Sequence, residues 1–153
     1  MNVRRATEAD AAEACDVLRR SISELCRLDH NGDPALLEMW LSNKTVENVQ
    51  RWIAEAHFFV AEEGTRLLGV AAMNDAGKIT LNYVAPEARF RGVSKALVAE
   101  LEETARNLGL AECRLESTRT ALRFYRGLGY ADADERYILP LTGTPAIVLR
   151  KRL

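Results

Sequence analysis

The chain has 153 residues, of which 48% are hydrophobic and 28% charged, and its formal net charge is −1. This length and composition fit one globular domain, residues 1–153, with a sizeable core. The balanced charge argues against a nucleic-acid partner and against the acidic excess of a disordered tail.

The apolar runs are too short to span a bilayer, and no apolar signal core follows the N-terminal residues. Three cysteines and two histidines lie at no metal-binding or redox spacing. We therefore expect a cytoplasmic protein with no membrane partner and no metal site. Its thiols should be reduced and buried as small hydrophobic groups: Cys15, Cys26 and Cys113.

The first part of the chain is predicted to form a short strand at residues 2–6 followed by three helices. Thr7 can cap the first helix, which should end near Arg27, before a polar turn. The second helix should open at Asp33–Pro34, because proline suits the first helical position. Thr45 can cap the third helix.

Three strands should follow, at residues 57–62, 66–73 and 78–84. The turns between them are short, so neighbouring strands should pair antiparallel. A helix starting near Val93 should then bury Leu97, Leu101, Ala105 and Leu108, which are spaced three or four apart.

The last third of the chain supplies a strand at residues 112–116, a helix capped by Thr118, and two closing strands, from Tyr130 and over 144–151. A strand reached through a helix is normally parallel to the strand before it. We therefore predict an α+β fold with a mixed, mostly antiparallel sheet of about seven strands and helices on both faces.

A basic turn lies between the strand ending at Val84 and the helix that follows. Pro86 stops strand pairing, because it has no N–H to donate. Arg89, Arg91 and Lys95 surround Gly92. The unpaired N–H groups at the start of a helix suit phosphate oxygens, and Gly92 would allow close backbone approach. Arginines at a helix start can equally be only solvated, so the turn alone leaves both interpretations open.

The segment Arg89-x-x-Gly92-x-Ser94 resembles the Arg/Gln-x-x-Gly-x-Gly/Ala loop of the GNAT N-acetyltransferases, which grips the pyrophosphate of acetyl-coenzyme A. Ser94 stands where that family usually has glycine or alanine. The segment Ala121-x-x-Phe124-Tyr125, with Gly129-Tyr130 after it, is similar to a second motif of the same family. Both motifs occur in the family's order, so the chain is identified as a member.

The resemblance implies the acyl-CoA N-acyltransferase fold and an acetyl-CoA-dependent N-acetyltransferase. The acetyl group would pass directly to a primary amine in a ternary complex, with Tyr125 as the general acid. Backbone groups of Val84 would pair with the pantetheine arm. The residues implied to contact acetyl-CoA are Tyr83, Val84, Arg89, Phe90, Arg91, Gly92, Val93, Ser94, Lys95, Ala96, Ser117 and Phe124.

The general base is not identified, because the strand at 78–84 carries no carboxylate. A carboxylate from the first two helices or a water chain held by Asn82 could serve. The acceptor is also open: a small-molecule amine or a protein amine, with Trp40 either lining its pocket or buried in the core. A homodimer fits the family.

Two other functions stay open. One is a non-catalytic acyl-CoA-binding sensor or regulatory module. The other is a protein that binds a different phosphorylated ligand on the same basic turn.

Overall fold

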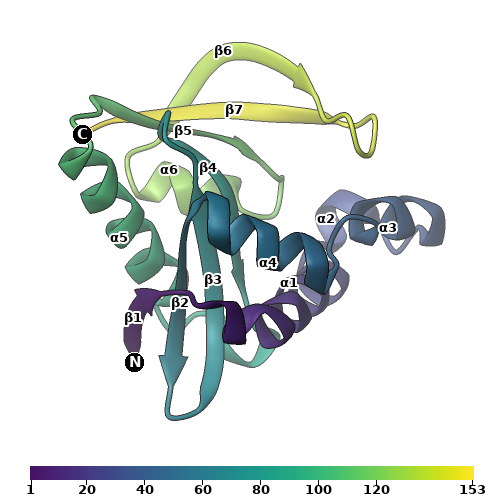
Figure 1. Cartoon of the computed structure of the whole chain (residues 1–153). Helices are drawn as coiled ribbons and strands as arrows, with labels where there is room; N and C mark the ends of the chain where they lie inside the picture. Colours follow the sequence, from purple (N-terminus) through teal and green to yellow (C-terminus); the bar gives the residue numbers. More distant parts are fainter.

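One seven-stranded sheet runs through the protein (Figure 1). The structure, a computed structural model, describes all 153 residues. The spatial order of the strands is β1-β2-β3-β4-β5-β7-β6, and only β4 and β5 are parallel. The predicted mixed, mostly antiparallel sheet is therefore confirmed. The strands are β1 (Asn2–Arg5), β2 (His57–Glu63), β3 (Arg66–Met73), β4 (Lys78–Val84), β5 (Glu112–Ser117), β6 (Ala131–Ile138) and β7 (Pro145–Arg152).

The chain has six α-helices and two short 3₁₀ helices; α1 and α5 both pack on β3 and β4, whereas α2 and α3 extend to one side, next to α1 (Figure 1). No helix combines the length and the apolar character needed to cross a membrane. The helices are η1 (Glu8–Asp10), α1 (Ala11–Leu25), α2 (Arg27–His30), α3 (Pro34–Leu41), α4 (Val46–Glu55), η2 (Pro86–Ala88), α5 (Val93–Asn107) and α6 (Leu122–Gly127).

Local capping positions the helices as the sequence predicts. The Asp33 carboxylate accepts a hydrogen bond from the Ala35 N–H at 3.0 Å, with Pro34 at the first helical position of α3. The Thr45 hydroxyl accepts from the Asn48 N–H at 3.2 Å at the start of α4. Such bonds satisfy N–H groups that have no partner inside the helix.

Two expectations about local structure were wrong. The polar turn expected at residues 29–32 is shorter, because residues 27–30 form helix α2 and only Asn31 and Gly32 form the turn, and His30 is only 1% exposed. Its ring is buried because both nitrogens are bonded, Nε2 with the Ile22 carbonyl and Nδ1 with the Gly32 N–H. Leu108, expected to face inward, is 46% exposed, because α5 has already ended at Asn107.

Helix α5 lies unusually close to the sheet. A Cβ atom added to Gly69 of β3 would come within 2.7 Å of Val93 Cγ1 and 3.0 Å of Leu97 Cδ1. Glycine at this position therefore lets the first turn of α5 rest on the strand. The contact fixes the start of α5 beside the end of β4.

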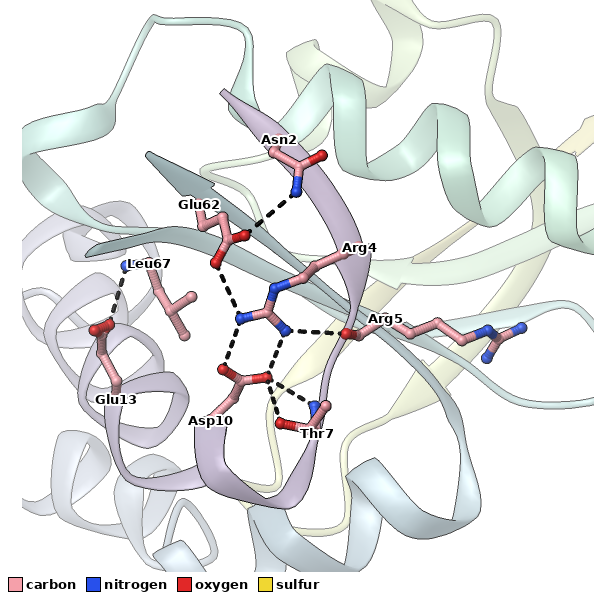
Figure 2. A network of polar contacts seen from close by, with 8 residues as sticks. All are labelled: Asn2, Arg4, Arg5, Thr7, Asp10, Glu13, Glu62 and Leu67. Atoms are coloured by element: carbon pink, nitrogen blue, oxygen red, sulfur yellow. Dashed lines mark hydrogen bonds and ion pairs between the residues drawn. The ribbon is translucent and has the colours of Figure 1, made fainter. Parts of the chain in front are cut away.

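Polar contacts secure the N-terminal strand (Figure 2). The Arg4 guanidinium donates to both Asp10 oxygens, at 2.8 and 2.9 Å, and to Glu62 at 3.0 Å, which ties η1 to β1 and β2. The Glu13 carboxylate accepts from the Leu67 N–H at 3.0 Å and joins α1 to β3. This network lies on the β1 side of the sheet, away from the parallel pair β4–β5.

Candidate active site

Strands β4 and β5 separate after a short paired stretch. Only Lys78 pairs with Arg114 and Ile79 with Leu115, although β4 continues to Val84 and β5 to Ser117. The other edge of β4 stays paired with β3 as far as Val84. The β5-facing edge of residues 80–84 thus has free backbone groups that an extended ligand could pair with.

The basic turn leads from the end of β4 into α5. Gly92, the N-cap residue of α5, has a left-handed φ of 78°. The Ala96 N–H is bonded to the Gly92 carbonyl at 3.1 Å, so the N–H groups of Val93, Ser94 and Lys95 precede the first helical bond. The side chain of Val93 is buried. Only its backbone can therefore face a ligand.

The side chains of the turn differ in their surroundings. Arg91 is ion-paired with Glu63 at 2.8 Å. The Arg89 guanidinium lies 4.5 Å from the centre of the Phe90 ring. Phe90 is 90% exposed and has a left-handed φ of 65°, which is uncommon for an aromatic residue. The turn therefore presents two arginines, one aromatic ring and the helix N-terminus to solvent.

Tyr125 of α6 reaches β4 across the gap. The Asn82 amide nitrogen donates to the Tyr125 hydroxyl oxygen at 3.0 Å. Tyr125 is 6% exposed, and burial raises the pKa of its hydroxyl to about 12. The Asn82 Oδ1 atom is buried and has no hydrogen-bond partner. The phenol is thus protonated at neutral pH, beside an unsatisfied acceptor.

A cavity of about 520 Å³ opens next to this gap. Helices α2 and α3, strands β4, β5 and β7, and the loop between β6 and β7 form its walls. Trp40 and Tyr83 supply aromatic surface, and Trp40 is half-buried at the cavity wall. Trp40 therefore lines a pocket, whereas Trp52 packs against the core.

Two carboxylates line this cavity. Glu116, at the end of β5, is paired with Lys78 of β4 at 2.7 Å. Asp29 of α2 accepts from the backbone N–H groups of Arg119 and Thr120, at 2.7 and 3.2 Å, and so holds the segment before α6. Asp29 comes from the segment that was expected to be a turn between the first two helices, and its oxygens are already engaged.

The sequence reasoning missed Glu116 and Lys44. Glu116 alternates with buried residues along β5, which is typical of any half-buried strand. Lys44 lies in the polar break between α3 and α4, yet it is 6% exposed and lines the cavity. Burial lowers the pKa of Lys44 to about 8.

The predicted residues fall into three groups. The turn residues and Val84 lie together at the start of α5. Tyr83 and Ser117 line the cavity, and the Ser117 hydroxyl donates to the Thr118 carbonyl at 2.8 Å. Phe124 packs edge-on against Tyr125, with ring centres 5.2 Å apart. No cluster of three or more His, Cys, Asp or Glu side chains could hold a metal ion.

Comparison with known proteins places the chain in a family. Residues 28–138 match the model described as the acetyltransferase (GNAT) domain. The chain is 28% identical over 116 residues to the peptidyl-lysine N-acetyltransferase YiaC of Escherichia coli strain K12, with 66% of this chain and 78% of that protein covered. The chain therefore belongs to the GNAT family and is an acetyltransferase.

Solved structures share the whole fold. A GCN5-related N-acetyltransferase from Rhodopseudomonas palustris superimposes with a TM-score of 0.91 at 21% identity, covering 99% of this chain and 95% of that one. The PaiA N-acetyltransferase from Thermoplasma acidophilum, solved with coenzyme A, gives 0.82 at 18% identity, covering 99% and 98%. At these identities the likeness concerns the fold.

Proposed function

We propose that the protein transfers the acetyl group of acetyl-CoA directly to a primary amine within a ternary complex. The observation that carries this proposal is the unpaired edge of β4. It runs from the basic turn, at Val84, to Thr80 and Leu81, which line the cavity. One ligand lying along this edge would bring its reactive end to a second ligand in the cavity.

The residues along this edge fit coenzyme A. Free backbone groups at residues 80–84 suit an extended pantetheine arm, and the buried Asn82 Oδ1 lacks the donor that an amide N–H would supply. The N–H groups at the start of α5, together with Arg89 and Lys95, suit a pyrophosphate. We therefore assign the loop Arg89–Ala96 to the pyrophosphate.

Direct transfer is favoured because the chain offers no reactive thiol. Cys15, Cys26 and Cys113 are at most 5% exposed. Burial raises the pKa of Cys26 to about 12 and that of Cys113 to about 11. Because the thiolate is the nucleophile, none of these groups is suited to carry the acetyl group.

Acetyl-CoA, when bound, supplies an acetyl group activated as a thioester. The new C–N bond forms to the amine nitrogen, and the C–S bond breaks. We propose that Glu116 accepts the proton that the amine loses, directly or through a water, because its carboxylate lines the cavity. Holding both reactants in place supplies much of the acceleration.

We propose that Tyr125 donates a proton to the departing sulfur. Its hydroxyl oxygen accepts a bond from Asn82, which leaves the O–H free to donate elsewhere. Burial raises the pKa of Tyr125 to about 12, so the proton is present at neutral pH. Tyr125 then regains a proton from solvent or from Glu116, and the net proton passes from amine to sulfur.

The test is thiol release from acetyl-CoA with a panel of amines. Release that depends on the amine supports the proposal, and binding without release would point to a non-catalytic acyl-CoA module. Two variants remove the same ion pair in different ways, Glu116→Gln and Lys78→Met. If Glu116 is the base, Glu116→Gln lowers kcat at least about tenfold while Lys78→Met does not. Equal losses in both would contradict that role.

A further inference from the structure

The charges that line the cavity are unevenly matched. Both carboxylates have cationic or N–H partners within the chain: Glu116 pairs with Lys78, and Asp29 holds the N–H groups before α6. The two lining cations, Lys44 and Arg119, have no carboxylate within ion-pairing distance. Lys44 and Arg119 therefore have no anionic partner within the chain that could share their charge.

Of the two cations, Lys44 gives the stronger evidence for an anionic ligand, because it is 6% exposed. Its ammonium donates only to neutral oxygens, the Trp40 carbonyl at 3.3 Å and Asn43 Oδ1 at 2.6 Å. An ammonium has three donors, so one remains. Bonding the last carbonyls of α3 does not require burial, since an exposed lysine can do the same from solvent. A buried cation without an anion is unfavourable unless a ligand supplies the anion.

The size of the cavity restricts that ligand. About 520 Å³ is in the usual range for small-molecule sites, roughly 300–1,000 Å³. Leu36 and Trp40 on one wall and Leu141 on the β6–β7 loop add apolar surface around the charges. The site therefore suits a compact molecule with an anionic group and some apolar surface.

We infer that the acceptor is a small primary amine that also carries a carboxylate, of the amino-acid class, and that Lys44 binds this carboxylate. This inference rests on the proposed N-acetyl transfer and deepens it. The amine of such an acceptor lies toward Glu116 on β5, and its carboxylate lies toward the α3 end of the cavity, where Lys44 and Arg119 can neutralise it. Lys44 thus determines specificity and takes no part in the chemical step.

The experiment compares free amino acids with the amines that differ only by loss of the carboxylate: phenylalanine with phenethylamine, tyrosine with tyramine, and lysine with cadaverine. Each is assayed by thiol release for kcat and KM. We expect kcat/KM at least about tenfold higher for the amino acid of a preferred pair, the scale of one hydrogen bond to a charged group. In Lys44→Met this ratio should fall at least about tenfold, mostly through KM, whereas Lys44→Arg should retain most of it.

Each possible result either supports or overturns the inference that Lys44 binds an acceptor carboxylate. Equal kcat/KM within every pair in the parent protein overturns the inference, as does a ratio that Lys44→Met leaves unchanged. Turnover with lysine peptides but with no free amino acid also overturns it and leaves the proposed function standing. No turnover with any amine, although titration shows acetyl-CoA binding, overturns both. If a Lys44 variant does not fold, the comparison of amino acids with their decarboxylated amines in the parent protein still tests the inference.

Discussion

The basic turn before α5 and the cavity beside β5 are built in different ways. The turn is one continuous stretch, residues 84–96, and its binding groups are backbone N–H groups and exposed cations. The cavity has walls from several separate segments, and its charged groups range from buried Lys44 through half-buried Asp29 and Glu116 to exposed Arg119. A site made from one turn keeps its chemistry when the surroundings change, whereas a site made from distant segments can change with any one of them.

Tyr125 is bonded to Asn82 on β4, the strand whose free edge runs between the two regions, and its loss should have the largest effect. Tyr125→Phe keeps the ring and its packing but removes the proton donor. We expect kcat to fall by roughly tenfold to a thousandfold, with little change in acetyl-CoA affinity. Steady-state kinetics and isothermal titration measure the two effects separately.

Tyr130→Phe is the matched control for that experiment. Tyr130 is also buried and packs edge-on against Tyr125, but its hydroxyl donates to Glu102 at 2.9 Å, on α5. Its kcat should stay within about twofold of the parent protein. If Tyr125→Phe also stays within that range, Tyr125 has no part in the mechanism.

On the cavity side, the burial of Lys44 should reduce stability. Burial lowers the pKa of Lys44 from 10.5 to about 8. Below pH 8 the folded protein carries this unfavourable charge in full, and the penalty disappears as pH rises to about 10.5, where the unfolded state also loses its proton. Lys44→Met should therefore raise the free energy of unfolding at pH 7 by roughly 1–3 kcal/mol.

Urea unfolding of the parent protein and of Lys44→Met at pH 7 and pH 10.5 measures this difference. The gain should be largest at pH 7 and small at pH 10.5, because the lysine is then neutral in the folded state and half-protonated in the unfolded state, so little charge penalty remains. A variant that is less stable at pH 7 would show that Lys44 contributes to the fold through its bonds to Trp40 and Asn43.

The same contrast between a local turn and a cavity of distant segments explains which features the sequence predicts. The helix starts at Asp33 and Thr45 were predictable, because their bonding partners lie two or three residues along the chain. The parallel pairing of β4 with β5 followed from the helix between them. The capping signals are local in sequence, and the strand pairing depends only on the order of the elements.

The charged side chains of the cavity could not be predicted in this way. Lys44 follows Ser42 and Asn43 in a segment that looks solvated. Its carbonyl accepts hydrogen bonds from Cys15 and Arg19 of α1, and its ammonium donates to the Trp40 carbonyl of α3, so helices distant in sequence enclose it. Glu116 gains its place from the separation of β4 and β5, which no single strand pattern indicates. Burial of this kind depends on contacts between distant segments, so only the structure reveals it.

The basic turn itself is tested by Gly92→Val. Gly92 has a left-handed φ of 78°, and no atom lies within 4 Å of the position that a Cβ would take, so the substitution strains the backbone without an internal clash. A valine in this conformation costs about 1–2 kcal/mol and should shift the N–H groups that open α5. We expect acetyl-CoA affinity to fall at least tenfold, about 1.4 kcal/mol.

Gly109→Val is the matched control, because Gly109 follows the other end of α5, has the same φ of 78° and is equally open. It should lose similar stability and keep acetyl-CoA affinity, since it lies at the opposite end of the helix from the turn. Titration of both folded variants with acetyl-CoA separates strain from binding. Equal affinity in the two variants would mean that the turn does not hold the pyrophosphate, because the same backbone strain would then have the same effect at either end of α5.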